Sequence, residues 1–473
     1  MLDPPIDAPA PGPSSPDWWE PLPQLRLVPR PPPDPAGTAA RRLARFVSWN
    51  VLGTGTSLAL GFGASVLLAR LLGPSNRGVL AVMLSAGTLA LALTAGGLPV
   101  SVVYFAARRR EAGPAILGNC LLHGLVLAAV LVPLALLASG SLGRALTHGH
   151  GGGTWGLAAA LVPVTFLDWT THSQLQGRLE FGRYNALLVL QRITYLIGVL
   201  ILLGVLSLGI SSALIATMAG SAVMIAGSAL PILRAGRPRL DLTLMREMLH
   251  YGARAQIGSV LQIANGRLDV IVLGLFRPTA QVGYYVVAQT LAELVVQLAD
   301  TFQWSNMALV ASDDGERSGP GTSALAIRHL TLVAGLAAAA DAGFGTLVIT
   351  FAYGPAFRPA VLPMLILLPG VWLMAIAVVA QGDLGGRGRP GLASALTAAA
   401  AALTVVLDLA LIPLFGVIGA AIASTCAYSA LGLASLVTLN RVSGIPLRRL
   451  CVPGRADLAV YVRFVRRVLS GRR

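Results

Sequence analysis

Polar side chains recur at helical spacing along one apolar stretch of the chain, residues 249–276. They are Arg254, Gln262, Asn265 and Asp269, with Gly258 on the same face. Guanidinium, amide and carboxylate groups on one helix face could bind the hydroxyl and phosphate groups of a polar ligand. At about 1.5 Å per residue, the stretch predicts a single helix of roughly 42 Å, which is long enough to cross a bilayer. Polar groups at membrane depth usually face a water-filled cavity but can also join packed helices, and we favour the cavity.

Three other stretches repeat this pattern. Residues 281–311 carry Gln289, Glu293, Gln297 and Asp300, residues 155–176 carry Thr165, Asp168 and His172, and residues 47–72 carry Asn50, Thr54 and Ser57. A single polar stripe is explained by hydrogen bonds between packed helices, whereas four stripes together predict a shared hydrated cavity.

Arginine side chains are natural partners of an anionic ligand, because the planar guanidinium can bind two oxygens of a carboxylate or phosphate at once. We therefore add three arginines, Arg192, Arg267 and Arg328, to the polar stripes as candidates for binding a substrate. The candidate substrate-binding residues are Arg192, Arg254, Gln262, Asn265, Arg267, Asp269, Gln289, Glu293, Gln297 and Arg328. Arg267 lies off the polar stripe, and it could bind a ligand or pair with Asp300 or Asp341 on another helix.

If the predicted helices form a transporter, ionisable residues within them could couple the movement of a substrate to that of a cation. The candidate ion-coupling residues are Asp168, His172, Asp300 and Asp341. The membrane potential is the alternative driving force, because an inside-negative potential favours outward movement of an anion by about 2.3 kcal/mol per charge per 100 mV. The sequence does not choose between the two.

The composition excludes an ordinary soluble protein. The 473 residues are 55% hydrophobic and 12% charged, with a mean hydropathy of +0.73, whereas soluble domains are about 25% charged. The net charge of +15 is carried by arginine, since lysine is absent. Most arginines lie in short connections, where they orient a membrane protein rather than bind nucleic acid. Without lysine there is no P-loop, and the three cysteines lack metal-ligand spacing, so we expect no cofactor and no metal.

The lengths of the apolar stretches, and the Gly, Pro and Arg residues that separate them, predict about twelve transmembrane helices. They cover roughly 47–72, 79–106, 115–138, 155–176, 185–207, 211–233, 249–276, 281–311, 326–353, 359–382, 391–414 and 417–440. We expect an all-α membrane fold with two six-helix lobes around a central polar cavity. The expected parts are a disordered Pro-rich tail (1–40), lobes at 41–234 and 249–440, a cytoplasmic linker (235–248) and a basic tail with an interfacial helix (441–473).

The arginine distribution predicts the orientation of these helices. The connections on the outer side hold four arginines, Arg77, Arg144, Arg277 and Arg358, while those on the inner side hold thirteen. Because positive charge accumulates on the cytoplasmic side, we expect both termini in the cytoplasm.

Four segments resemble the bacterial polysaccharide flippases (Wzx-like) of the multidrug/oligosaccharidyl-lipid/polysaccharide exporter superfamily. They are LLARLLGPSNRGVLAVMLS (67–85), RLDVIVLGLFRPTAQVGYYVVAQTLAEL (267–294), FAYGPAFRPAVLPMLILLPG (351–370) and GRGRPGLASALTAAAAALTVVLDLALIPLFGVIGAAIAS (386–424). The segments follow the order expected of the family. Asp408 is a departure, because the family often has asparagine there.

This resemblance implies a transporter, not an enzyme, that moves undecaprenyl-diphosphate-linked oligosaccharides from the inner to the outer leaflet of the bacterial plasma membrane. The implied partners are the lipid-linked oligosaccharide, the bilayer, and polysaccharide polymerases and glycosyltransferases. A monomer is expected, although the sequence does not fix the oligomeric state, and the resemblance does not specify the glycan.

Other functions remain open. A cation-coupled drug or metabolite antiporter of the same superfamily would have a smaller cavity with fewer internal arginines. A lipid II flippase has fourteen helices in that family, whereas this chain has room for twelve and a surface helix. A polytopic glycosyltransferase needs a larger extramembrane loop than 139–154, and a non-transporting scaffold would leave the polar stripes unexplained.

Overall fold

The computed structural model describes the backbone of residues 36–311 and 321–451, and most side chains from Gly55 onward. Most of the predicted N-terminal tail (1–40) and most of the predicted basic tail with its interfacial helix (441–473) lie outside these residues. The first helix begins at Ala36, so it includes the last five residues of the predicted N-terminal tail.

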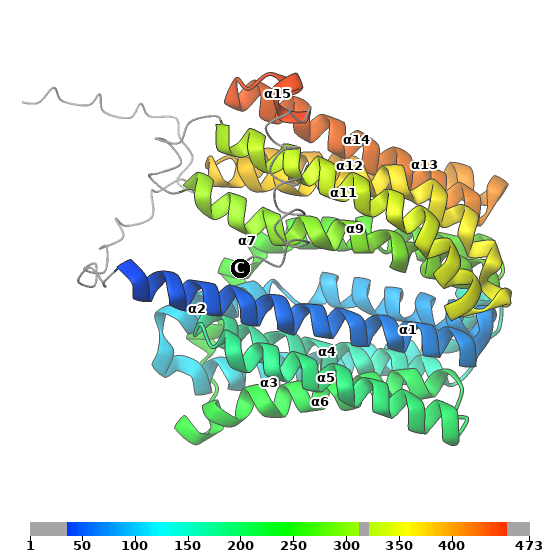
Figure 1. Ribbon diagram of the computed structural model, residues 1–473. Helices are drawn as coiled ribbons and strands as arrows, with labels where there is room; N and C mark the ends of the chain where they lie inside the picture. The colour runs from blue at the N-terminus through cyan, green and yellow to red at the C-terminus, as the bar shows by residue number, and fades with distance from the viewer. Residues whose placement is uncertain (1–35, 312–320, 452–473) are drawn as a thin grey trace, which may run out of the picture. The chain divides into compact units, whose positions relative to one another are not determined.

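The described chain is helical throughout, without a strand (Figure 1). The first six predicted spans correspond to α1 (Ala36–Thr94), α2 (Leu98–Arg108), α3 (Gly113–Thr147), α4 (Thr154–Gly177), α5 (Phe181–Val199) and α6 (Ile210–Ala235). The rest correspond to α7 (Leu242–Asn265), α8 (Leu268–Phe276), α9 (Thr279–Ala311), α11 (Gly321–Leu347), α12 (Val361–Gly386), α13 (Pro390–Phe415) and α14 (Val417–Ser443). A short α15 (Leu447–Cys451) follows. Short 3₁₀-helices lie at Arg110–Ala112 and Pro355–Ala360, and π-helical segments extend α5 and α11 at Leu200–Val205 and Val348–Tyr353.

Eight helical stretches in the described residues are long and apolar enough to cross a membrane. One of them, Gly55–Thr94, contains parts of two predicted spans, because α1 runs through the expected connection. The helices α4, α7 and α9 are not among these eight stretches. Each of the three carries one of the polar stripes described above, and polar residues lower the hydropathy of a helix. The expected all-helical membrane fold is therefore confirmed, and its most polar helices are the candidates for lining a pathway.

The first predicted connection is reduced to one residue. Gly73 has φ 71° and interrupts α1, and the helix resumes at Pro74. Proline suits this first position, because it needs no backbone N–H partner there. Arg77, which we expected in an outer loop, therefore lies within a helix.

The predicted single helix over 249–276 is wrong. Helix α7 ends at Asn265, and α8 begins at Leu268 after a break at Gly266 and Arg267. Glycine destabilises a helix interior by about 1 kcal/mol relative to alanine, and Gly266 lies directly after the last residue of α7. At its other end, α7 begins where the Asp241 carboxylate accepts a hydrogen bond of 2.9 Å from the Leu244 N–H, which is a standard N-cap.

Helices from the first half of the sequence pack mainly with one another, as do those from the second half. Within Leu52–Arg473, α4 packs on α3 and α6, and α6 packs on α5. Helix α12 packs on α9, α11 and α14 (Figure 1).

Two close backbone approaches connect the halves. A Cβ atom at Gly283 of α9 would lie 2.1 Å from the carbonyl oxygen of Pro74 in α1, and one at Gly97 before α2 would lie 2.0 Å from that of Gly252 in α7. Only glycine fits at these contacts, because a larger residue would separate the helices.

Candidate functional site

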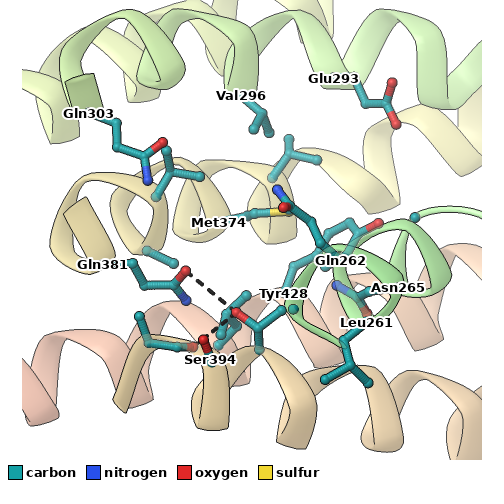
Figure 2. Close-up of a pocket in the computed structure, with 18 of the residues that line it drawn as sticks. Leu261, Gln262, Asn265, Glu293, Val296, Gln303, Met374, Gln381, Ser394 and Tyr428 are labelled. Atoms are coloured by element: carbon teal, nitrogen blue, oxygen red, sulfur yellow. Dashed lines mark hydrogen bonds between the residues drawn. The ribbon is translucent and has the colours of Figure 1, made fainter. Parts of the chain in front are cut away.

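The break between α7 and α8 lies between two cavities. The first has a volume of about 510 Å³ and is lined by α7, α9, α12, α13 and α14 (Figure 2). We call it the amide cavity, because its lining includes Gln262, Asn265, Gln297, Gln303 and Gln381. Its hydroxyl groups come from Ser394, Thr397 and Tyr428.

Some amides of this cavity are held in place, and others have unused hydrogen-bonding capacity. The Thr404 hydroxyl donates to the Asn265 Oδ1 over 2.7 Å, whereas the contact of 3.5 Å from the Thr397 hydroxyl to the Gln381 Oε1 is long for a hydrogen bond. The buried Oε1 of Gln297 has no hydrogen-bond partner among the described residues. Because a buried polar atom without a partner costs about 1–3 kcal/mol, Gln297 is prepared to bind a polar ligand.

The second cavity has a volume of about 570 Å³ and contains two arginines. We call it the arginine cavity, since Arg77 of α1 and Arg267 of the α7–α8 break both line it. Gln289, Glu293 and Trp169 also contribute to its wall.

Arg77 is a deeply buried cation. Its side chain is 8% exposed, and an Nη2 contact of 3.5 Å to the Ser65 Oγ is long for a hydrogen bond. The Nε atom has no partner in the described part of the chain. A guanidinium this poorly paired favours an anionic ligand in the cavity.

The two cavities adjoin each other. Glu293 lines both, and the break contributes Gly266 to the amide cavity and Arg267 to the arginine cavity. Arg267 and Glu293 both line the arginine cavity. Unwound segments of membrane helices are tolerated where they line such a cavity.

The structure thus brings six of the predicted substrate-binding residues to the two cavities. They are Gln262, Asn265, Arg267, Gln289, Glu293 and Gln297. The Nε2 of Gln289 is buried without a partner in the described residues, as is the Oε1 of Gln297. Arg254 lies on α7, but its side chain is outside the description.

Asp269 lines neither cavity. Its Oδ2 accepts a hydrogen bond of 2.6 Å from the Tyr285 hydroxyl, which is also 2.9 Å from the Ser424 Oγ. Its Oδ1 accepts one of 2.7 Å from the Val270 N–H. These contacts connect α8 to α9 and α14, so Asp269 acts as a structural anchor. Asp408 is also fully buried, with no hydrogen-bond partner among the described residues.

Asp168 and His172 also lie outside the two cavity linings. The Asp168 Oδ2 accepts hydrogen bonds of 2.7 Å from both the Gln191 Nε2 and the Ser221 Oγ. The His172 Nδ1 is 3.3 Å from the Asp168 Oδ1. This network connects α4, α5 and α6, and Asp168 is surrounded by partners from the protein itself.

The remaining predicted residues are dispersed. Arg192 is exposed on α5, with its Nε 3.3 Å from the Ser57 Oγ of α1. Arg328 and Asp341 are half-buried on α11 and line neither cavity. Asp300 lies on α9, but its side chain is outside the description.

Several lining residues were not predicted from the sequence. Arg77 was assigned to a loop, although Gly73 and Pro74 could have indicated a helix start directly before it. Gln381, Thr397 and Tyr428 lie in otherwise apolar helices, where single polar residues have no recognisable spacing.

Comparison with known proteins relates this site to a family. A family model described as polysaccharide biosynthesis protein matches residues 43–302, which is more than half of the chain. The probable low-salt glycan biosynthesis flippase Agl15 of Haloferax volcanii is 23% identical over 291 residues, covering 60% of each chain. An uncharacterized membrane protein of Methanocaldococcus jannaschii is 26% identical over 207 residues, covering 42% of this chain and 40% of that protein. The chain thus spans less than two thirds of the length of these relatives.

Solved transporter structures share the fold. An inward-facing multidrug resistance MATE family transporter of the MOP superfamily superposes with a TM-score of 0.67 and 17% identity, covering 82% of this chain and 94% of that one. The lipid II flippase MurJ in an inward closed conformation gives a TM-score of 0.70 and 15% identity, covering 85% and 89%. The resemblance to polysaccharide flippases is confirmed: the chain belongs to the polysaccharide biosynthesis protein family and has the fold of MOP-superfamily transporters.

Proposed function

We propose that this protein carries a lipid-linked oligosaccharide across the bacterial plasma membrane by alternating access. The sugar lies in the amide cavity and the diphosphate in the arginine cavity. The observation that carries the proposal is that Arg77 and Arg267 line a cavity adjoining one that is lined by amides.

The chemistry of each cavity matches one part of this substrate. Glutamine, serine and threonine can donate to and accept from sugar hydroxyls, and the Tyr428 ring offers an aromatic face. Two guanidinium groups can bind the oxygens of a diphosphate in pairs. Each cavity also falls within the roughly 300–1,000 Å³ that is typical of ligand sites.

The membrane potential supplies a driving force for this substrate. A dianionic diphosphate moving outward across an inside-negative potential of 100 mV gains about 4.6 kcal/mol, at 2.3 kcal/mol per charge. This gain requires that the arginine charges remain in the protein while the substrate crosses. Glu293 beside Arg267 keeps the cavity from holding the anion too tightly for release.

Alternating access needs two bodies that separate on one side at a time. We assign these bodies to residues 41–234 and 249–440, joined by the linker 235–248. The glycine approaches of Gly283 to Pro74 and of Gly97 to Gly252 are the contacts between them that open alternately.

The carrier is undecaprenyl diphosphate in this proposal, and the oligosaccharide crosses chemically unchanged. Both termini lie in the cytoplasm. Glycosyltransferases would supply the substrate on the inner side, and a polymerase would consume it on the outer side. The family match and the similarity to Agl15, named as a probable glycan biosynthesis flippase, support this assignment.

A cation-coupled drug antiporter is the second candidate, favoured by the fold shared with a MATE transporter. A cationic drug would face two arginines and one carboxylate in the arginine cavity, and the net charge there opposes it.

Transport by the purified full-length protein in proteoliposomes distinguishes the two functions. The substrates are a fluorescent undecaprenyl-diphosphate oligosaccharide and a cationic dye. We expect the lipid-linked sugar to reach the opposite leaflet intact and the dye to remain where it was. Dye transport without sugar transport would overturn the proposal and support the antiporter.

A further inference from the structure

An apolar groove opens beside the arginine cavity. It has a volume of about 400 Å³ and is formed by α1, α3 and α4. Its thirteen lining residues include no charged side chain, and seven of them are Ala or Gly. The small side chains of Ala86, Ala90, Ala135, Ala138 and Ala159 leave space where leucines would have filled it.

The groove adjoins the arginine cavity. Met83 and Gly87 of α1 and Ala158 and Val162 of α4 line both of them. A Cβ atom at Gly87 would be in ordinary contact with the Val162 Cγ2 at 3.6 Å, so α1 and α4 pack closely at this boundary, and the side chains that form it are small or apolar.

The groove also faces the hydrocarbon of the bilayer. Leu134 of α3 lines it and is 58% exposed, while the neighbouring Leu137 is 86% exposed. Trp155 of α4 closes its inner wall and is buried. A chain in this groove would contact protein atoms along its length, and such dispersion contacts are individually small but add up.

We infer that this groove binds the polyisoprenoid chain of the lipid-linked substrate while its diphosphate occupies the arginine cavity. The inference rests on the proposed function. The chain is covalently attached to the diphosphate, so it must leave the arginine cavity across an apolar boundary, and the residues shared between cavity and groove form such a boundary. A methyl-branched chain needs more width than a straight one, which the row of alanines supplies.

The position of the groove assigns it to one stage of transport. It lies near the end of α3 and the start of α4, next to the connection at 148–153. With both termini cytoplasmic, that connection is extracellular, so the groove lies in the outer half of the bilayer. It therefore holds the lipid chain as the diphosphate leaves toward the outer leaflet.

The test compares binding of two ligands to the full-length protein in detergent. One is an undecaprenyl-diphosphate sugar, and the other carries the same head group on a chain of two isoprene units. The wild type should bind the long chain about tenfold or more tightly than the short one. Ala135→Phe, which fills the groove, should abolish this preference and leave the short ligand's Kd unchanged. Leu137→Phe adds the same ring on the exposed side of α3 and should keep the preference.

The outcomes separate this inference from the proposed function. If Ala135→Phe still prefers the long-chain ligand, the groove assignment alone is overturned. The same holds if Ala135→Phe binds both ligands equally more weakly while its unfolding temperature is unchanged. If Ala135→Phe does not fold, Ala138→Leu tests the same wall with a smaller side chain. Phosphatidylglycerol and undecaprenyl phosphate are also compared as competitors of the bound undecaprenyl-diphosphate sugar. If they compete equally well, the groove binds bilayer lipid and the inference is overturned. A wild type that binds neither ligand overturns both proposals.

Discussion

Arg77 of α1 and Arg267 at the α7–α8 break line the same cavity, although they lie in opposite halves of the sequence. Each is placed there by an irregular backbone segment: Gly73 interrupts α1 just before Arg77, and Gly266 directly precedes Arg267. The two interruptions bring cationic side chains into the membrane-embedded part of the protein, where unpaired charge is costly. Such a cost is typical of groups retained for function.

Replacing Arg77 by Gln removes this charge and keeps most of the side-chain length. We expect transport of the lipid-linked sugar to fall about tenfold or more, since charge-assisted hydrogen bonds contribute roughly 1.5–3 kcal/mol. Initial transport rates in proteoliposomes provide the measurement. Arg144→Gln, an exposed arginine near the end of α3, is the matched control and should transport normally. Normal transport by Arg77→Gln would remove Arg77 from the site.

The amide cavity should discriminate sugars from bare lipid carriers. Gln381→Leu removes hydrogen-bonding groups from this cavity, and we expect weaker binding of the lipid-linked oligosaccharide by about fivefold to tenfold. Binding of undecaprenyl diphosphate without sugar should be unchanged, because that ligand reaches only the arginine cavity. Equal weakening of both ligands would mean that Gln381 does not contact the sugar.

The approach of α9 to α1 should depend on glycine. A methyl group at Gly283 would lie 2.1 Å from the Pro74 carbonyl oxygen, so Gly283→Ala must push the two helices apart. We expect a loss of about 1–3 kcal/mol in stability, as for overpacked cores. The thermal unfolding midpoint measures this effect. Gly343→Ala on α11, where no atom lies within 4 Å of the added carbon, should leave the midpoint unchanged or raise it.

The hydrogen bond from Tyr285 to Asp269 should matter for stability. Tyr285→Phe leaves the buried Asp269 Oδ2 without its donor, which costs about 1–3 kcal/mol. Unfolding in detergent at several temperatures would show a lower midpoint. Tyr251→Phe changes an exposed tyrosine and serves as the control. An unchanged midpoint for Tyr285→Phe would contradict the anchoring role of Asp269.

The sequence allowed the fold class and one face of the site to be predicted, but not the whole cavity. Helical periodicity identified Gln262 and Asn265 on α7 and Glu293 and Gln297 on α9, because a polar stripe is a local property. It could not show that α7 ends at Gly266, since an isolated glycine is tolerated inside a helix. For that reason Asp269 was placed on the same stripe, whereas it packs against Tyr285.

Lining residues on helices without a polar stripe could not be predicted from the sequence. Gln381 and Thr397 belong to the amide cavity only because α12 and α13 pack beside α7 and α9. Such contacts depend on the tertiary arrangement and leave no periodic signal. The polar stripe on α4 shows the same limit, since the sequence could not show that Asp168 accepts hydrogen bonds from α5 and α6 and lies outside the two cavity linings.

The most direct test of the central claim is outward translocation of a fluorescent undecaprenyl-diphosphate-linked sugar in proteoliposomes, with and without an imposed inside-negative potential. Wild type and Arg267→Ala are compared at equal amounts of folded protein. The account predicts that the potential accelerates transport by the wild type and that Arg267→Ala loses most of this transport. Wild-type protein that moves no lipid-linked sugar, or an Arg267→Ala variant with wild-type rates at every potential, would contradict it.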